Sequence, residues 1–90
     1  MSFPFNEVHI KGQLFLREFK SSVDPEELIW HLDKEDRIIE VIKGKNWQLQ
    51  LDNQLPMELV EGKQYKIEKL QYHRLIKGTG DLVIKLYKML

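Results

Sequence analysis

The 90-residue sequence predicts an all-β protein, a small sandwich or barrel, from three observations. From residue 28 onward, apolar side chains tend to recur at every second position, which is the period of a half-buried strand. The alternating segments are short, and turn-forming residues such as Gly44, Gly62 and Gly78-Thr79-Gly80-Asp81 separate them. Seven such segments follow one another along the chain. Short strands at this spacing are typical of a β-sandwich or β-barrel.

The first 27 residues differ from this pattern, and we expect them to pack on a barrel formed by residues 28–90 within one domain. Apolar residues recur here at roughly helical spacing, at Leu14, Phe15, Leu16, Phe19 and Val23. The run Asp24-Pro25-Glu26-Glu27 that follows has turn chemistry. The spacing therefore predicts a short N-terminal helix whose face of Phe15, Leu16 and Phe19 contacts the barrel.

The barrel strands are predicted in order along the rest of the chain. Their ranges are Leu28–Asp33, Arg37–Lys43, Trp47–Asp52, Met57–Val60, Gln64–Glu68, Tyr72–Lys77 and Leu82–Tyr87. The third alternates most clearly, with Trp47, Leu49 and Leu51 on one face and polar side chains on the other. This pattern predicts that one face of the third strand belongs to the core.

The polar loop Lys34-Glu35-Asp36 predicts a hairpin between the first two strands. In this register Asp33 lies opposite Arg37, and the inward face reads Ile29, His31, Asp33, Arg37, Ile39 and Val41. The outward face reads Leu28, Trp30, Leu32, Ile38, Glu40 and Ile42. Both faces are mostly apolar, so a second layer must cover the outward one. We expect the N-terminal segment and a symmetric homodimer to do so.

Composition limits the classes of partner. The net charge is zero and the pI is about 6.8, which argues against a nucleic-acid partner. Residues 1–61 carry 7 basic and 12 acidic side chains, and residues 62–90 carry 7 and 2. Two interpretations are open: these charges pair across interleaved strands, or the later half forms a basic patch for an anionic partner. The chain has no cysteine, no signal-like start and no apolar run near the ~20 residues of a membrane helix, so we expect a cytoplasmic protein.

His31, Asp33 and His73 are the candidate metal ligands. On a strand, residues i and i+2 share a face, so His31 and Asp33 would project together, and a later strand would supply His73. Two histidines and one carboxylate are a known ligand set for non-haem iron. The alternative is that Arg37 forms a bidentate ion pair with Asp33 and occupies its carboxylate.

The same residues have a spacing that resembles the two motifs of the cupin family. His31 stands at the first histidine of the first motif, Asp33 at the second histidine, Arg37 at the glutamate and Gly44 at the closing glycine. Gly62 and His73 match the ends of the second motif, whose proline and glycine positions hold Glu68 and Leu70. The resemblance covers residues 28 to about 86, and Lys77–Asp81 is similar to the loop that follows the second motif.

The resemblance implies a small double-stranded β-helix, or jelly-roll, barrel that is commonly dimeric. Many cupins hold iron, manganese, zinc or nickel, while others only bind ligands; Arg37 in place of glutamate removes one family ligand. We expect a divalent metal (Fe, Mn, Zn or Ni) on His31, Asp33 and His73, with a small polar or anionic ligand near Arg37 and Gln71. Two alternatives stay open, a metal-free binding module and a protein-interaction scaffold. No particular reaction follows from the sequence.

Overall fold

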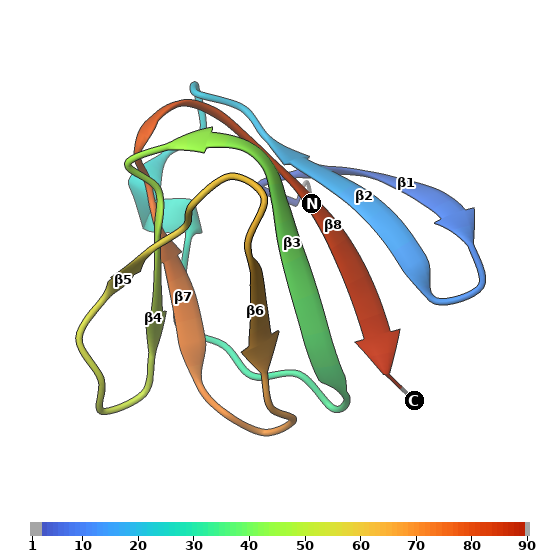
Figure 1. The fold of residues 1–90 in the computed structure, drawn as a ribbon. Coiled ribbons are helices and arrows are strands. Elements are labelled where there is room, and N and C mark those ends of the chain that lie inside the picture. Colours follow the sequence, from blue (N-terminus) through green and yellow to red (C-terminus); the bar gives the residue numbers. More distant parts are fainter. Residues whose placement is uncertain (1–2, 90) are drawn as a thin grey trace.

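The computed structural model describes residues 3–89, which form eight strands and a single turn of 3₁₀ helix (Figure 1). The elements are β1 (Asn6–Lys11), β2 (Leu14–Phe19), η1 (Pro25–Glu27), β3 (Asp36–Lys45), β4 (Gln48–Leu51), β5 (Met57–Glu58), β6 (Gln64–Ile67), β7 (His73–Ile76) and β8 (Thr79–Met89). The all-β prediction is confirmed. Met1, Ser2 and Leu90, at the ends of the expected segments 1–27 and 28–90, lie outside the described residues. The described chain contains no helix with the length and apolar character to cross a membrane.

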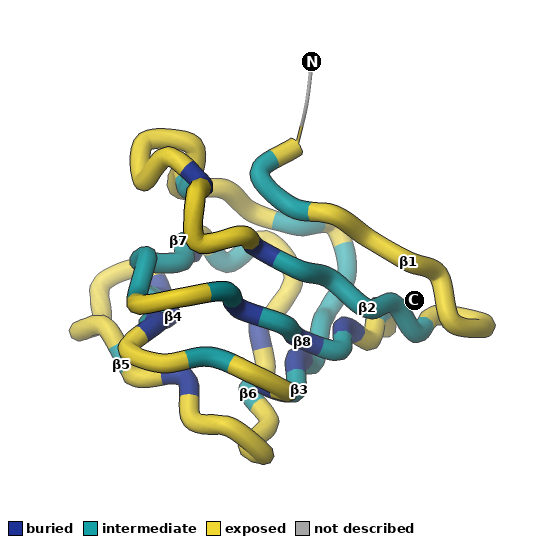
Figure 2. Tube along the Cα trace, turned by 90° about the horizontal axis from the view of Figure 1, so that it is seen from above, coloured by how far each residue is buried: buried dark blue, intermediate teal, exposed yellow. Residues whose placement is uncertain are grey.

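The strands form two antiparallel sheets that enclose one core. The larger sheet has the order β1-β2-β8-β3-β6, and the smaller one has the order β5-β4-β7 (Figure 1). Both sheets contribute buried side chains, and Figure 2 shows the exposed strand β1 at the rim of the molecule. The buried apolar core consists of Phe19, Val23, Ile39, Val41, Trp47, Leu49, Leu51, Leu59, Ile67, Leu82, Ile84 and Leu86.

Strands β3 and β8 form the centre of the larger sheet, and their register decides which side chains face the core. Ile39 lies opposite Leu86, and Arg37 lies opposite Lys88. Because side chains alternate along a strand, all four project from the same face of the sheet. Ile39 and Leu86 are buried in the core, and Arg37 and Lys88 continue this inner face toward one end of the strands.

The predicted N-terminal helix is wrong: residues 6–19 form the hairpin β1–β2. Strand β2 pairs with β8 over six residues, from Leu14 opposite Tyr87 to Phe19 opposite Leu82. The apolar residues at 14, 15, 16 and 19 fit a strand as well as a helix, because Phe15, Arg17 and Phe19 alternate onto one face. The open edge of β8 decides between the two, since pairing there satisfies a full row of backbone groups.

The predicted strand Leu28–Asp33, and with it the predicted hairpin, is also wrong. Both edges of β3 are already paired, with β8 on one side and β6 on the other. The segment instead follows η1 as irregular chain and touches the smaller sheet at a single isolated bridge, between His31 and His73. Ile29, which the hairpin would have buried, is 64% exposed. Trp30 and Leu32, which were predicted to lie on a covered outward face beside Ile38, are exposed and do not lie beside Ile38 on β3.

The other predicted strands are confirmed with shifted ends. The face of Trp47, Leu49 and Leu51 is buried as expected. Strand β3 continues through Gly44 to Lys45. Strand β8 begins at Thr79, so only Gly78 of the predicted turn 78–81 lies outside a strand. Gly78 is required there, because a Cβ atom at this position would lie 2.3 Å from the carbonyl oxygen of Lys45.

Candidate metal centre and cavity

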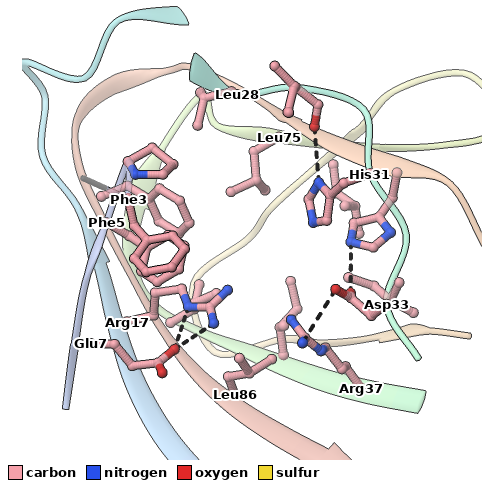
Figure 3. A pocket seen from close by; sticks show the side chains of 18 of the residues that line it. Phe3, Phe5, Glu7, Arg17, Leu28, His31, Asp33, Arg37, Leu75 and Leu86 are labelled. Carbon is pink, nitrogen blue, oxygen red and sulfur yellow. Dashed lines mark hydrogen bonds and ion pairs between the residues drawn. The ribbon is translucent and has the colours of Figure 1, made fainter. Parts of the chain in front are cut away.

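A cavity of about 800 Å³ opens between the two sheets (Figure 3). His31, Asp33, His73 and Arg37 form a polar cluster on one side of it, and Phe3, Phe5 and Arg17 line the other side. Apolar side chains such as Leu28, Leu75 and Leu86 complete the wall. A mostly apolar cavity with a few convergent polar groups is the usual form of a small-molecule site.

Backbone pairing brings the two histidines together. His31 and His73 exchange both backbone hydrogen bonds, with N···O distances of 3.0 and 2.9 Å. Residues paired in this way across antiparallel chains project their side chains to the same face. The two imidazole rings accordingly lie 4.3 Å apart, centroid to centroid. The isolated bridge at His31 therefore places the two histidine side chains next to each other in the site.

Each histidine ring is held by a carbonyl oxygen two residues earlier in the chain. His31 Nδ1 lies 3.0 Å from the oxygen of Ile29, and His73 Nδ1 lies 2.8 Å from the oxygen of Gln71. A carbonyl oxygen only accepts, so Nδ1 is the protonated nitrogen in both rings. In the neutral imidazole, Nε2 then carries the lone pair. Fixing the tautomer through the other ring nitrogen is how proteins prepare histidine to ligate a metal.

Asp33 supplies a carboxylate that is only half satisfied. Its side chain is 10% exposed, and its backbone oxygen accepts a hydrogen bond of 2.8 Å from the Leu70 amide, which anchors the irregular segment. Oδ1 lies 3.4 Å from Nη2 of Arg37. Oδ2 is buried, lies 3.2 Å from Nε2 of His73, and has no aligned hydrogen bond with any residue of 3–89. A buried oxygen in this state is costly unless a cation or proton reaches it.

The surroundings lower the pKa of Asp33. Burial acts in the opposite direction, because it penalises the charged form. The contact with His73 and the positive charge of Arg37, with smaller contributions from the histidine charges, together outweigh burial. Asp33 is therefore a carboxylate at neutral pH, which is the form that ligates metals.

Arg37 contacts Asp33 as the sequence predicted, but through different geometry. The two residues are not cross-strand partners; Asp33 precedes β3, and the side chain of Arg37 reaches back to it. Arg37 also contacts Glu35, with 3.0 Å between Nη2 and Oε1. The ion pair engages Oδ1 and leaves Oδ2 toward the histidines. The two interpretations of Asp33, metal ligand and partner of Arg37, are therefore compatible.

One ligand atom from each of His31, Asp33 and His73 lies within 4.8 Å of the others, so the three are close enough to hold a metal ion. Metal–ligand bonds are about 2.0–2.2 Å long, so side chains that converge in this way can share one ion. The fixed tautomers and the unsatisfied Oδ2 make the donor chemistry fit a divalent transition metal.

The remaining predicted residue, Gln71, lies next to the site rather than in the cavity wall. Its carbonyl oxygen orients His73, while its side-chain oxygen lies 3.4 Å from the Glu68 amide. The side chain does not line the cavity in the described structure, and its contact with a ligand stays a prediction. Gly62, the glycine matched to the second motif, adopts φ of 84°, a backbone conformation that favours glycine.

Sequence reasoning missed Arg17 and Glu7, which also line the cavity. Nε of Arg17 donates to Oε2 of Glu7 at 2.8 Å, and the guanidinium carbon lies 3.8 Å from the centre of the Phe5 ring. A strand interpretation of residues 14–19 would have placed Arg17 between Phe15 and Phe19 on an apolar face. This alternation is the sequence pattern from which Arg17 could have been predicted to face the cavity.

Comparisons agree on the fold. No protein-family model matches the sequence, and no curated protein matches it. A cupin-2 domain protein from Shewanella frigidimarina has a TM-score of 0.69 at 17% identity, with 100% of this chain and 83% of that chain covered. A cupin domain protein from Bordetella pertussis has a TM-score of 0.63 at 13% identity, with coverage of 100% and 98%.

The iron(II) form of HppE is a third similar structure, with a TM-score of 0.67 at 16% identity. The alignment covers 94% of this chain but only 48% of HppE, so this chain spans about half the length of that enzyme. These likenesses, the two-sheet topology and the cavity between the sheets agree with the spacing of the sequence motifs. The chain folds as a cupin.

Proposed function

We propose that this protein holds a divalent transition metal on His31, Asp33 and His73 and binds a small organic molecule beside it in the cavity. The observation that carries the proposal is the buried Oδ2 of Asp33, which lacks an aligned hydrogen bond among residues 3–89 and faces the histidine cluster. Bound iron(II) or cobalt(II) in HppE, a cupin-fold enzyme, supports the choice of metal class.

The contact between Asp33 and His73 explains why a cation belongs here. Two atoms that both carry lone pairs repel at 3.2 Å in a poorly hydrated site, unless a positive charge lies between them. A divalent ion bound between the two atoms would supply this charge. A bound divalent ion acts as a Lewis acid toward a ligand oxygen.

The chain's own residues would then perform separate tasks. The carbonyl oxygens of Ile29 and Gln71 keep the two imidazoles oriented. Arg37 balances the charge of Asp33 and holds its carboxylate through Oδ1. The apolar wall around Leu75 and Leu86 limits access of water to the site.

Metal binding is tested on protein expressed without a histidine tag. Its metal content is measured first, and heat unfolding is then followed with Fe²⁺, Mn²⁺, Zn²⁺ or Ni²⁺ added. At least one ion is expected to raise the unfolding temperature, because an ion that binds only the folded chain stabilises it. The Asp33→Asn variant removes the ligand charge and should lose the shift. His9→Ala is the matched control, because His9 lies on the exposed β1 and contacts the Gly12 carbonyl oxygen instead.

The alternative functions are outcomes of the same experiment. If no ion shifts unfolding and the purified protein contains no metal, then the metal-free module with Arg37 as its anchor replaces the metal proposal. If neither metals nor small molecules bind, the interaction scaffold is left.

The predicted homodimer remains a proposal, and the outer face of the larger sheet supports it. Large apolar side chains on this face remain exposed on three strands: Val8, Ile10, Ile42, Tyr87 and Met89. A patch of this kind is typical of an interface between protein chains. Glu40 and Lys85 lie opposite each other within it, so the face offers both charges to a second copy of itself.

Sedimentation at micromolar concentration measures the assembly. We expect a dimer that Ile38→Glu dissociates, because Ile38 lies on this outer face opposite Tyr87. Leu55→Glu is the control, since Leu55 is 87% exposed in the loop between β4 and β5. A monomeric wild type would contradict the dimer.

A further inference from the structure

Arg17 brings a second cation into the cavity, on the wall formed by the larger sheet. Its side chain is 13% exposed and extends from β2 across from the buried Ile84. Both of its hydrogen bonds, from Nε and Nη2, go to the same carboxylate oxygen, Oε2 of Glu7. Nη1 makes no hydrogen bond with the described residues. One edge of the guanidinium is therefore available to another acceptor.

The surroundings of Arg17 are unfavourable for its charge. Burial lowers the pKa of the guanidinium, and the charge of Arg37 lowers it further, although Glu7 acts in the opposite direction. Arginine nonetheless remains charged at neutral pH. An additional negative charge in the cavity would relieve both effects, because it would screen the two arginines from each other and replace lost hydration.

Arg17 is one of three cations on this inner face. Arg37 and Lys88 are cross-strand neighbours, and both line the cavity with Arg17. Figure 3 shows the guanidinium groups of Arg17 and Arg37 facing the same open space. Arg37 is already paired with Asp33 and Glu35, whereas Lys88 has no carboxylate within 4.0 Å among residues 3–89. The larger sheet therefore presents a positive charge to the cavity that its own ion pairs do not neutralise.

Most of the remaining wall is apolar, although Asn6 and Glu27 also line it, and this apolar surface sets the second requirement for a ligand. Phe5 lies against Arg17, Leu75 lies on the side of His31, and Leu86 lies on the side of the two arginines (Figure 3). The volume of about 800 Å³ is within the range of small-molecule sites. A ligand that fits this wall has one oxyanion and a short apolar body.

We propose that the cavity binds a small monocarboxylate, with its carboxylate on Nη1 of Arg17 and its apolar body directed between Leu75 and Leu86 toward His31, Asp33 and His73. The planar guanidinium edge matches a carboxylate better than a compact ammonium would. This inference deepens the proposed function by naming the ligand class of the same cavity. The carboxylate end itself does not depend on a bound metal.

The test measures binding of hexanoate by titration calorimetry to protein treated with a chelator, so that the probe has no metal to bind. Hexanamide and inorganic phosphate are the comparison probes. We expect hexanoate to bind at least tenfold more tightly than hexanamide, because one charge-assisted hydrogen bond contributes on this scale. Phosphate should bind more weakly than hexanoate, because it lacks the apolar body.

Variants assign the binding to Arg17. Arg17→Gln should weaken hexanoate at least tenfold, to the level of hexanamide, while Arg74→Gln should leave it unchanged. Arg74 is the matched control, because it lies outside the cavity lining and contacts Gln50 and the Trp30 ring. If Arg17→Gln does not fold, Glu7→Gln provides the test: it removes the competing carboxylate and should tighten hexanoate binding.

Each outcome separates this inference from the metal proposal. Equal affinities for hexanoate and hexanamide, or an Arg17→Gln variant that binds hexanoate as the wild type does, would overturn the carboxylate site and leave the metal result standing. Hexanoate binding in a protein that takes up no metal would sustain this site and refute the metal proposal. Hexanoate binding that appears only after metal is added would place the carboxylate on the metal and overturn the role of Arg17.

Discussion

The two walls of the cavity are built in different ways. On the wall of the larger sheet, Arg17, Arg37 and Lys88 extend from β2, β3 and β8, three adjacent strands in a continuous ladder. On the opposite wall, His73 belongs to β7, but His31 and Asp33 lie on an irregular segment. That segment is joined to the smaller sheet by the His31–His73 bridge and tied to the Leu70 amide through Asp33.

The difference shows that the fold holds the side chains of one wall more firmly than those of the other. Many backbone pairs fix the register of the larger sheet, so its cations keep their positions when one contact is lost. The histidine wall depends on few backbone bonds, so its ligands have more freedom to adjust around an ion. The following predictions test whether the two walls respond differently, in order of decreasing effect.

Arg37→Ala should destabilise the protein the most, because it leaves Asp33 and Glu35 without their cation in a poorly exposed site. We expect a loss of about 3 kcal/mol in the free energy of unfolding, the lower end of the range for breaking a buried pair. Urea unfolding measures it. Arg74→Ala, which loses a hydrogen bond to Gln50 and a contact with the Trp30 ring, should cost about 1 kcal/mol.

A double variant checks the physical cause. If the loss comes from an uncompensated carboxylate, then Asp33→Asn added to Arg37→Ala should restore part of the stability. Equal losses for Arg37→Ala and Arg74→Ala would show that the Arg37 ion pairs contribute little.

His31→Ala should separate metal binding from folding. His31 is exposed, so its removal should change the stability of the metal-free protein by only about 0.5 kcal/mol. At an ion concentration 100 times the dissociation constant, the wild type should gain about 2.7 kcal/mol, and the variant should lose most of this gain. Heat unfolding with and without the ion measures both values, and His9→Ala should behave as the wild type.

His73→Ala provides the contrast within the same wall. His73 is only 4% exposed and donates to the Gln71 carbonyl oxygen, so its removal should destabilise even the metal-free protein by about 2 kcal/mol. If the two histidine variants cost the same without metal, then the irregular segment is as firmly held as β7.

The pH dependence of stability should reveal Asp33. Its folded-state pKa is lowered, because the His73 contact and the Arg37 charge together outweigh the effect of burial. A lowered folded-state pKa stabilises the protein above the unfolded pKa of about 3.9, and this stabilisation is lost as pH falls through the folded value. Urea unfolding between pH 6 and pH 2 should therefore show a steeper loss of stability in the wild type than in Asp33→Asn. Parallel curves would contradict the lowered pKa.

Much of the fold and of the candidate site was determined by local sequence. Alternation from Trp47 to Leu51 predicted the buried face of β4, and the glycines at 62 and 78 marked turns between strands, whereas Gly44 lies within β3. The motif spacing also selected His31, Asp33 and His73, which the structure brings within reach of one ion. The buried face of β4 could be predicted because a strand's period is a local property. The metal-ligand set was selected by the resemblance to the family motifs, whereas the strand predicted to carry His31 and Asp33 does not form.

Tertiary structure alone decided the partners of each strand. The residues from Leu14 to Phe19 fit two periods, and the open edge of β8 selected the strand. The segment from Leu28 to Asp33 alternates well enough for a strand, yet β3 had no free edge, so His31 paired with His73 instead. The same choices carried Arg17 into the cavity and left Oδ2 of Asp33 facing the histidines. A sequence specifies which residues can pair, but competition among all strands for a limited number of edges determines which of them do, and that competition is a property of the whole chain.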